Sequence, residues 1–163
     1  MNDVADIDYD AKRRALAERY KPTGKPAGGD PVGTGGVDHL ALICADVGQT
    51  IAFYTEVVGM TLNKIVPNRD EPSSTHIFLD MGGGNFLAFF DFPKKGPAKT
   101  QRGVGSMHHL AMKATPAQYA RMVEALKARN VAHDVHEIDA AAGKAAVYFR
   151  DPDGILLEVT TGY

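Results

Sequence analysis

The stretch GSMHHLAM, residues 105–112, decides the fold because its His-Leu-Ala core repeats an earlier one. The earlier stretch is GGVDHLAL, residues 35–42, so His39 and His109 stand 70 residues apart. A repeat at a fixed period predicts copies of one structural unit that stack and bury their faces against each other.

The same offset continues to the end of the chain without a gap. IFLDMGGGNFLAFF at 77–90 lies over VYFRDPDGILLEVT at 147–160, and Gly84 falls on Gly154. The tetrapeptide MGGG of the first copy therefore takes the place of DPDG in the second. Both are turn sequences, and we interpret the two aspartates of DPDG as turn residues rather than catalytic ones.

Each copy predicts a strand, a helix and three further strands. In the first, Asp46 is placed to cap the helix, and in the second Thr115 is the cap with Pro116 at the first helical position. The expected elements of the first copy are a strand at 37–44, a helix at 47–58 and strands at 60–66, 74–80 and 85–91. Those of the second are a strand at 107–114, a helix at 116–129 and strands at 131–138, 144–150 and 155–161.

This order predicts an α+β fold of two βαβββ modules with paired sheets. The helices should cover one face of the sheets, and the other face should curve around a cavity. Outside the modules, a helix is expected at 9–20. The predicted domain organisation is an arm with a Gly/Pro-rich linker at 1–36, modules at 37–92 and 106–163, and a connector at 93–105.

Composition excludes several classes of protein. The 163 residues are 44% hydrophobic and 23% charged, typical of a globular protein, and a net charge of −2 gives no general attraction to nucleic acid or anionic membranes. Cys44 is the only cysteine, so no intrachain disulfide is possible. No signal-peptide core or transmembrane run is present. We expect a cytoplasmic protein that acts on small molecules.

The repeat separates the two histidines of the doublet. His39 pairs with His109, whereas the mate of His108 is Asp38. Neighbours in a strand point to opposite faces, so we expect His109 to face the cavity, and His108 to lie on the other face or at a strand edge.

Glu158 lies in apolar company within the last strand, at the repeat position of Ala88. Burying a carboxylate costs several kcal/mol unless a cation or a metal compensates. A single strand histidine is most often a core or edge residue. Two symmetry-related histidines plus an inward glutamate instead favour a metal site of His39, His109 and Glu158, with positions left open for substrate or oxygen.

Four motifs carry a resemblance to a known family: VDHLAL, AFYTEVVGM, MHHLAM and YFRDPDGILLE, which together span about residues 37–161. They resemble the vicinal oxygen chelate superfamily of glyoxalases, bleomycin-resistance proteins and ring-cleaving dioxygenases. The resemblance implies a divalent metal held by His39, His109 and Glu158, and a homodimer.

Ala88 departs from part of this family. It occupies the fourth ligand position of glyoxalase I-like and epimerase-like members and cannot coordinate a metal. The remaining His-His-Glu set is similar to that of Fe(II) extradiol dioxygenases, which cleave catechols with O2. The resemblance therefore implies Fe(II) first, with Mn(II), Ni(II) or Zn(II) as alternatives, since thiol transferases that inactivate fosfomycin also use His-His-Glu with Mn(II).

The predicted substrate pocket is aromatic, with Phe78, Phe86 and Phe90 on the site face around Ala88. Such a wall suits a planar ring. Tyr148 stands ten residues before Glu158, where the extradiol enzymes resemble this chain in having a tyrosine near the substrate.

The acid/base histidines of those enzymes are missing here, because the connector has none and Asp139 stands nine residues before Tyr148. We predict that Tyr148 and His136 move the proton, with His133 and His76 as alternatives. Two rival functions remain open: another metalloenzyme of the superfamily, either a glyoxalase-like lyase or a thiol transferase, and a non-enzymatic protein that binds or sequesters small molecules.

Overall fold

A computed structural model describes most of the chain. The first part of the connector expected at 93–105 and most of the linker within 1–36 lie outside the described residues. The described ranges are 8–22, 34–92 and 99–162.

The chain divides into two compact units, Met1–Gly36 and Val37–Tyr163. The first contains α1 (Tyr9–Tyr20), the helix expected at 9–20. The carboxylate of Asp8 begins it by accepting the N–H of Ala11 at 2.9 Å. The helix has mixed charges and no apolar stripe, so nothing in its sequence predicts a buried face.

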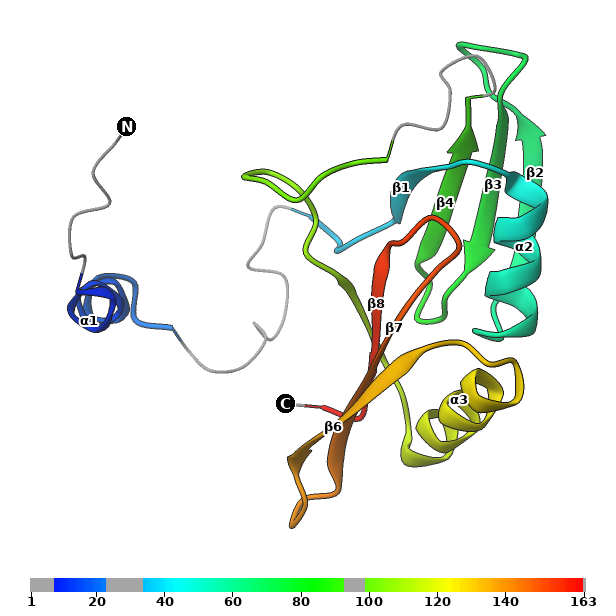
Figure 1. Ribbon diagram of the computed structural model, residues 1–163. Helices are drawn as coiled ribbons and strands as arrows, with labels where there is room; N and C mark the ends of the chain where they lie inside the picture. Colours follow the sequence, from blue (N-terminus) through cyan, green and yellow to red (C-terminus); the bar gives the residue numbers. More distant parts are fainter. Residues whose placement is uncertain (1–7, 23–33, 93–98, 163) are drawn as a thin grey trace. The chain divides into compact units, whose positions relative to one another are not determined.

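The second unit contains the repeat, and its two copies have the same order of elements (Figure 1). This confirms the α+β class and the two βαβββ modules. The first module consists of β1 (His39–Cys44), α2 (Val47–Glu56), β2 (Thr61–Pro67), β3 (Thr75–Asp80) and β4 (Phe86–Asp91). The second consists of β5 (Leu110–Lys113), α3 (Pro116–Ala128), β6 (His133–Asp139), β7 (Lys144–Arg150) and β8 (Leu156–Thr160).

Each module forms one four-stranded mixed sheet, in the orders β1-β4-β3-β2 and β5-β8-β7-β6. The first strand pairs in parallel with the last, and the other pairs are antiparallel. Ala41 lies opposite Ala88 in the first sheet, and Ala111 lies opposite Glu158 in the second. The 70-residue offset therefore extends to the pairing register, and Ala88 and Glu158 hold the same place in the two sheets.

The helix caps follow the sequence prediction. Asp46 accepts the N–H of Gln49 at 2.8 Å and begins α2. Thr115 and Gln118 form a reciprocal capping box at the start of α3, with Pro116 in its first turn. α2 ends at Glu56, two residues before the predicted end.

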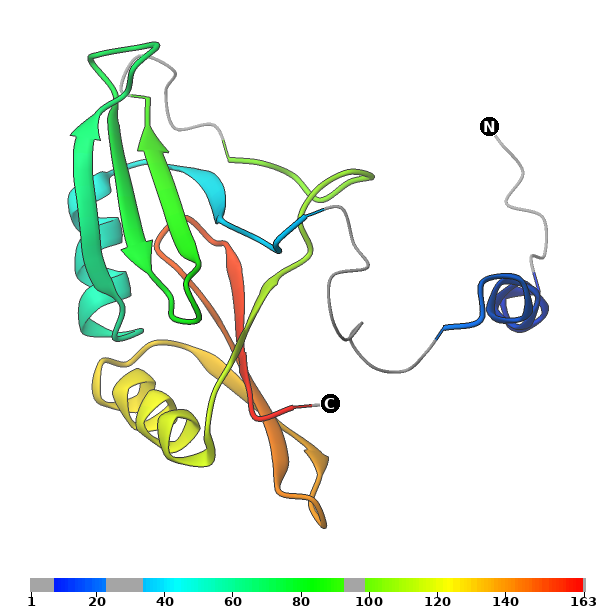
Figure 2. The ribbon, with the colours of Figure 1, turned by 180° about the vertical axis from the view of Figure 1, so that it is seen from behind.

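Each helix covers one face of its sheet, as Figures 1 and 2 show from opposite sides. The alternation predicted for the first strand is confirmed at Cys44, which is 3% exposed on the helix-covered face, while Ile43 is 62% exposed. Burial raises the pKa of the Cys44 thiol to about 11, which makes it unreactive near neutral pH.

The turn between β7 and β8 joins the two modules. The Tyr54 hydroxyl of α2 donates to Asp151 at 3.1 Å, and the N–H of Ala45 donates to the carboxylate of Asp153 at 3.2 Å. Phe53 also lies against Phe149, with ring centroids 6.3 Å apart. The modules thus share one core across this junction.

Candidate metal and aromatic site

The buried carboxylate predicted in the second module lies beside a histidine. Glu158 is fully buried in β8, and its Oε2 lies 3.0 Å from Nε2 of His109. His109 directly precedes β5, the parallel neighbour of β8. The pair joins an imidazole nitrogen and a carboxylate oxygen, two of the commonest metal-ligand atoms in proteins.

Tyr148 and His136 lie on the same face. Tyr148 of β7 is the register partner of Glu158, and His136 of β6 is the register partner of Ala146 in β7. The Tyr148 ring stands edge-on to both histidines, with centroids 5.9 Å from His109 and 5.3 Å from His136. The structure therefore brings together four of the predicted site residues: His109, His136, Tyr148 and Glu158.

His133 is not part of this group. It is the register partner of Phe149, whose ring packs on α2, and its Nδ1 lies 2.8 Å from the carbonyl oxygen of Val131. Of the two histidines of β6, only His136 is therefore on the face of Glu158.

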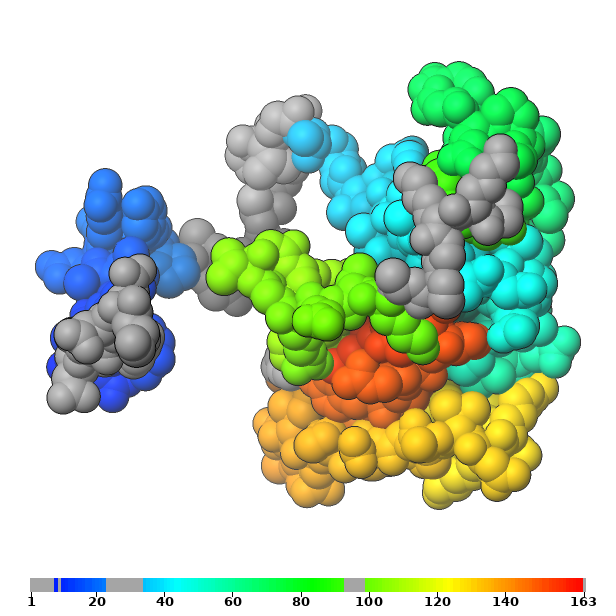
Figure 3. Space-filling view, turned by 45° about the horizontal axis from the view of Figure 1, so that its top comes forward, coloured from blue at the N-terminus to red at the C-terminus, as the bar shows by residue number. Residues whose placement is uncertain are grey.

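His108 precedes the strand that was predicted to contain it, and it contacts His109. Its Nδ1 lies 2.7 Å from Nδ1 of His109, so the two rings are hydrogen-bonded rather than directed apart. Strand alternation does not apply to them because pairing with β8 begins only at Leu110, not at residue 107. The segment before β5 instead runs beside the turn and start of β8, as the lime and red atoms in Figure 3 show.

The hydrogen bond between the two histidines occupies Nδ1 of His109 and leaves Nε2 available for a metal. One proton lies between the two Nδ1 atoms, and Nε2 is left directed at Glu158. Metal-binding histidines commonly have such a partner on the ring nitrogen that does not bind the metal.

The first module presents the aromatic wall. Phe86 of β4 lies opposite His39 and Phe90 lies opposite His76, while Phe78 of β3 is the partner of Ala88. The His39 and Phe78 rings are edge-on at 5.6 Å, and Nδ1 of His39 lies 2.6 Å from the carboxylate of Asp38. All three predicted phenylalanines thus share the face of His39.

His76 is stacked in this wall. Its ring lies 3.7 Å from Phe90 and 4.2 Å from Phe78, between centroids. Burial lowers the pKa of His76, and the nearby His39 and Lys64 lower it further. Its Nε2 is buried without a hydrogen-bond partner among the described residues. His76 therefore serves as a neutral aromatic side chain at neutral pH.

The structure does not bring His39 to the other two predicted ligands. Within 8–22, 34–92 and 99–162, no three His, Cys, Asp or Glu side chains lie close enough to hold one metal ion. The pair itself fits a metal, because adjacent ligands about 2.1 Å from an octahedral ion lie about 3.0 Å apart, the separation of His109 Nε2 and Glu158 Oε2.

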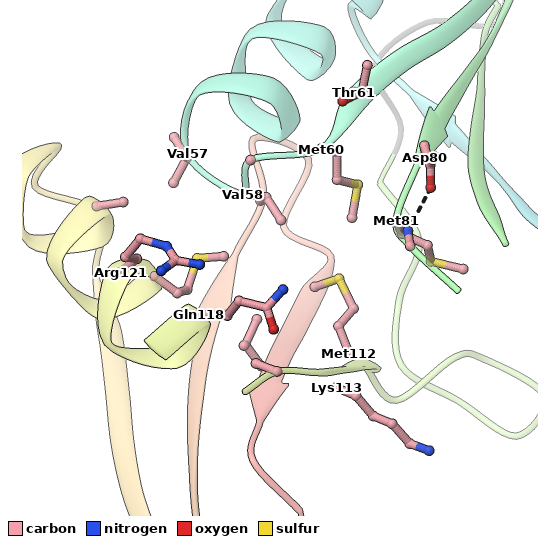
Figure 4. Close-up of a pocket in the computed structure, with 16 residues that line it drawn as sticks. Val57, Val58, Met60, Thr61, Asp80, Met81, Met112, Lys113, Gln118 and Arg121 are labelled. Atoms are coloured by element: carbon pink, nitrogen blue, oxygen red, sulfur yellow. Dashed lines mark hydrogen bonds between the residues drawn. The ribbon is translucent and has the colours of Figure 1, made fainter. Parts of the chain in front are cut away.

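Two cavities of similar volume have neither His109 nor Glu158 in their lining. One of about 530 Å³ lies next to the segment that includes His108. The other, of about 540 Å³, lies where α2, the turn after β3 and the start of α3 meet, and its lining is drawn in Figure 4. Neither cavity is predictable from the sequence, since each is lined by segments distant in the chain.

Comparisons with known proteins agree with the two-module fold. Residues 36–159 match the Glyoxalase family, which is described as the Glyoxalase/Bleomycin resistance protein/Dioxygenase superfamily. Among the described residues, no helix has both the length and the apolar character that crossing a bilayer requires.

Relatives include small proteins of similar length. The chain is 27% identical over 123 residues to Uncharacterized protein YwkD of Bacillus subtilis (strain 168), covering 76% of this chain and 94% of YwkD. It is 29% identical over 123 residues to Uncharacterized protein YaeR of Escherichia coli (strain K12), covering 76% and 93%. It is also 27% identical over 129 residues to the B. subtilis protein named "Putative ring-cleaving dioxygenase MhqA", covering 77% of this chain and 40% of MhqA.

Solved structures share the fold. A glyoxylase/bleomycin resistance protein/dioxygenase domain from Frankia sp. EAN1pec superposes with a TM-score of 0.68 at 19% identity, covering 80% of this chain and 99% of the domain. The fosfomycin resistance protein FosX from Listeria monocytogenes, complexed with Mn(II), gives a TM-score of 0.61 at 20% identity, covering 80% and 94%.

Proposed function

Because the chain belongs to the Glyoxalase/Bleomycin resistance protein/Dioxygenase superfamily, we propose that it is a metal-dependent ring-cleaving dioxygenase. Its substrate is a catechol-like aromatic, its co-substrate is O2, and its metal is Fe(II) held by His39, His109 and Glu158. The buried pair of His109 and Glu158 carries this proposal, because it fits two adjacent metal ligands. The relation to MhqA supports ring cleavage over the other chemistries of the superfamily.

We propose further that the third ligand, His39, comes from a second copy of the chain. Its side chain is 40% exposed, and Ile43 on the same face of β1 is 62% exposed, so this face is open to a partner. A symmetric dimer that places the aromatic face of one copy against the His109–Glu158 face of the other forms two identical sites.

Each residue then has a separate task. His109 and Glu158 bind the metal, and the bond from His108 holds His109 with Nε2 toward it. Phe78, Phe86 and Phe90 provide an apolar surface that binds the ring and excludes water. When bound, the metal supplies Lewis acidity toward the catechol hydroxyls and a redox centre for O2.

Tyr148 and His136 act on the substrate proton. Their rings are in contact on the face of Glu158, which supports placing both beside a catechol hydroxyl at the proposed metal. A proton accepted from that hydroxyl can pass from one ring to the other. His136 therefore takes the role that the sequence left open among three histidines.

Anaerobic loading with Fe(II), followed by O2 uptake on a panel of catechols, tests the reaction. We expect O2 consumption with the yellow colour of a ring-fission product. His109→Ala and Glu158→Ala should abolish it, whereas His133→Ala, on the helix-covered face, should not. Stoichiometric Fe(II) with no uptake on any catechol would exclude the dioxygenase and direct the search to thiol and aldehyde substrates. Absence of metal binding would favour a sequestering protein.

Mixing two inactive variants tests the shared site. A dimer of one His39→Ala chain and one Glu158→Ala chain contains one intact site if ligands come from both copies. Random pairing should then restore about one quarter of wild-type activity. No restoration after the mixed dimer has been isolated would show that the ligands come from one chain.

A further inference from the structure

The cavity between the two modules is separate from the metal face. It is lined by Met112 of β5 and Val159 of β8, and Val159 points away from its neighbour Glu158 because strand neighbours face opposite sides. None of the three predicted metal ligands lines it. Its volume of about 540 Å³ is in the range of small-molecule sites.

Methionines form much of the apolar lining. Met60, Met81, Met112 and Met122 come from four different segments and line the cavity, and Figure 4 labels the first three. Methionine side chains are unbranched and adjust to the shape of a bound group. The lining is therefore suited to an apolar chain or ring.

Two hydrogen-bond donors of α3 lie on one side of the cavity. The Gln118 Oε1 already accepts the N–H of Thr115 at 2.8 Å, which leaves its amide NH2 for the cavity. In the described part of the chain, the Arg121 guanidinium makes no ion pair and no hydrogen bond. Figure 4 shows both side chains directed into the space beneath Val58. Together they present a cation and an amide donor, which suits a carboxylate.

The repeat shows what occupies the equivalent junction in the other half. There the DPDG turn inserts carboxylates: Asp151 accepts from Tyr54, and Asp153 accepts from Ala45. The MGGG turn at the cavity has no carboxylate, and its glycines 82–84 all have φ between 68° and 88°. The nearby Asp80 accepts the N–H of Gly82 at 2.7 Å and so is engaged within its own turn.

We propose that this cavity is a second binding site, for a small amphipathic carboxylate such as an acyl or aryl acid. The carboxylate binds Arg121 and Gln118, and the apolar part lies among the methionines. The ligand thus supplies the negative group that the chain supplies itself at the other junction. This site is independent of the proposed dioxygenase chemistry.

Methyl-13C methionine NMR on the full chain, loaded with diamagnetic Zn(II), tests the proposal with octanoate as the probe. Octanoate should shift the methyl signals of the four cavity methionines and leave Met107, outside the cavity, unchanged. Arg121→Gln should weaken binding about fivefold, and Arg129→Gln, at the far end of α3, should not change it. 1-Octanol, which lacks the charge, should bind more weakly than octanoate.

Three results would overturn the site. Absence of any octanoate-induced shift excludes it, and equal shifts at Met107, which lines the other cavity, show that octanoate does not select this site. Equal binding by the Arg121→Gln and Arg129→Gln variants, or by 1-octanol, excludes recognition of the carboxylate. Repeating the titration after removal of Zn(II) by EDTA separates this site from the metal, since the shifts should persist.

Discussion

Ala88 and Glu158 occupy the same place in two sheets of the same design, yet their surroundings are opposite. Ala88 lies among Phe78, Phe86 and Phe90 in the first module, and Glu158 lies beside His109 and Tyr148 in the second. Both positions are fully buried. The difference shows that the βαβββ unit fixes where a side chain points but not its chemistry: the first module has an aromatic wall there, and the second has a buried His–Glu pair.

The turns differ in the same way. DPDG in the second module uses carboxylates to join the modules, whereas MGGG in the first leaves a cavity at the equivalent junction. The same turn position therefore closes one junction between the modules and leaves the other open.

We expect the largest effect from Glu158→Ala, which gives the second module the alanine that the first module has at the same place, and the quantity affected is metal affinity. Glu158→Ala removes one of the proposed ligands and leaves His109 without its carboxylate neighbour, so the affinity for Zn(II) or Fe(II) should fall more than about 100-fold. Isothermal titration with Zn(II) measures it. The exposed Glu137→Ala of β6 is the matched control and should keep wild-type affinity. Unchanged affinity in Glu158→Ala would remove it from the metal site.

The reverse change should destabilise the first module. Ala88→Glu buries a carboxylate among phenylalanines and should cost about 3 kcal/mol of unfolding free energy at pH 8, measured by urea denaturation. Burial raises the pKa of such a carboxyl, so its penalty grows as pH rises through that pKa and should be smaller at pH 5. Ala41→Glu, on the exposed neighbouring position, should cost little. Equal costs for the two variants would contradict the burial argument.

A smaller loss of stability is expected at the DPDG turn, where Tyr54 contacts Asp151. Burial raises the pKa of Asp151 above its usual value, and the Tyr54 hydroxyl partly opposes this. Tyr54→Phe should therefore cost about 2 kcal/mol of unfolding free energy at pH 7. The cost should shrink as pH falls through the pKa of Asp151, because the protonated carboxyl depends less on the donor.

Tyr119→Phe is the control for this prediction. Its hydroxyl donates to the carbonyl of Ala146 at 3.4 Å, a long neutral hydrogen bond, so its removal should cost about 0.5 kcal/mol or less. If the two tyrosine variants lose equal stability at pH 7, the Asp151 contact does not hold the modules together.

We expect the smallest effect on metal affinity from His108→Ala, which changes how the proposed ligand His109 is oriented but does not remove it. His108→Ala removes the partner of His109 Nδ1 and should weaken Zn(II) binding about tenfold. The visible absorption of the Co(II)-substituted protein should also change, because the ligand geometry is less constrained. His133→Ala should leave both unchanged. If the His108→Ala protein has wild-type affinity and spectrum, the His108–His109 hydrogen bond plays no part in metal binding.

The sequence alone determined everything that depends on local periodicity and on the repeat. Alternation placed Cys44 on the helix-covered face and Glu158 with Tyr148 on the other, and the caps at Asp46 and Thr115 set the helix starts. These features follow from the period-two geometry of strands and from hydrogen bonds between residues three positions apart.

Only the tertiary structure decided what depends on contacts between distant segments. The β6–β7 register selected His136 over His133, and the late start of β5 turned His108 onto His109. The separation of His39 from Glu158 and the cavity beside Arg121 depend on how the modules meet. Register and module packing are set by many weak non-local contacts acting together, and no pattern within one segment carries that information.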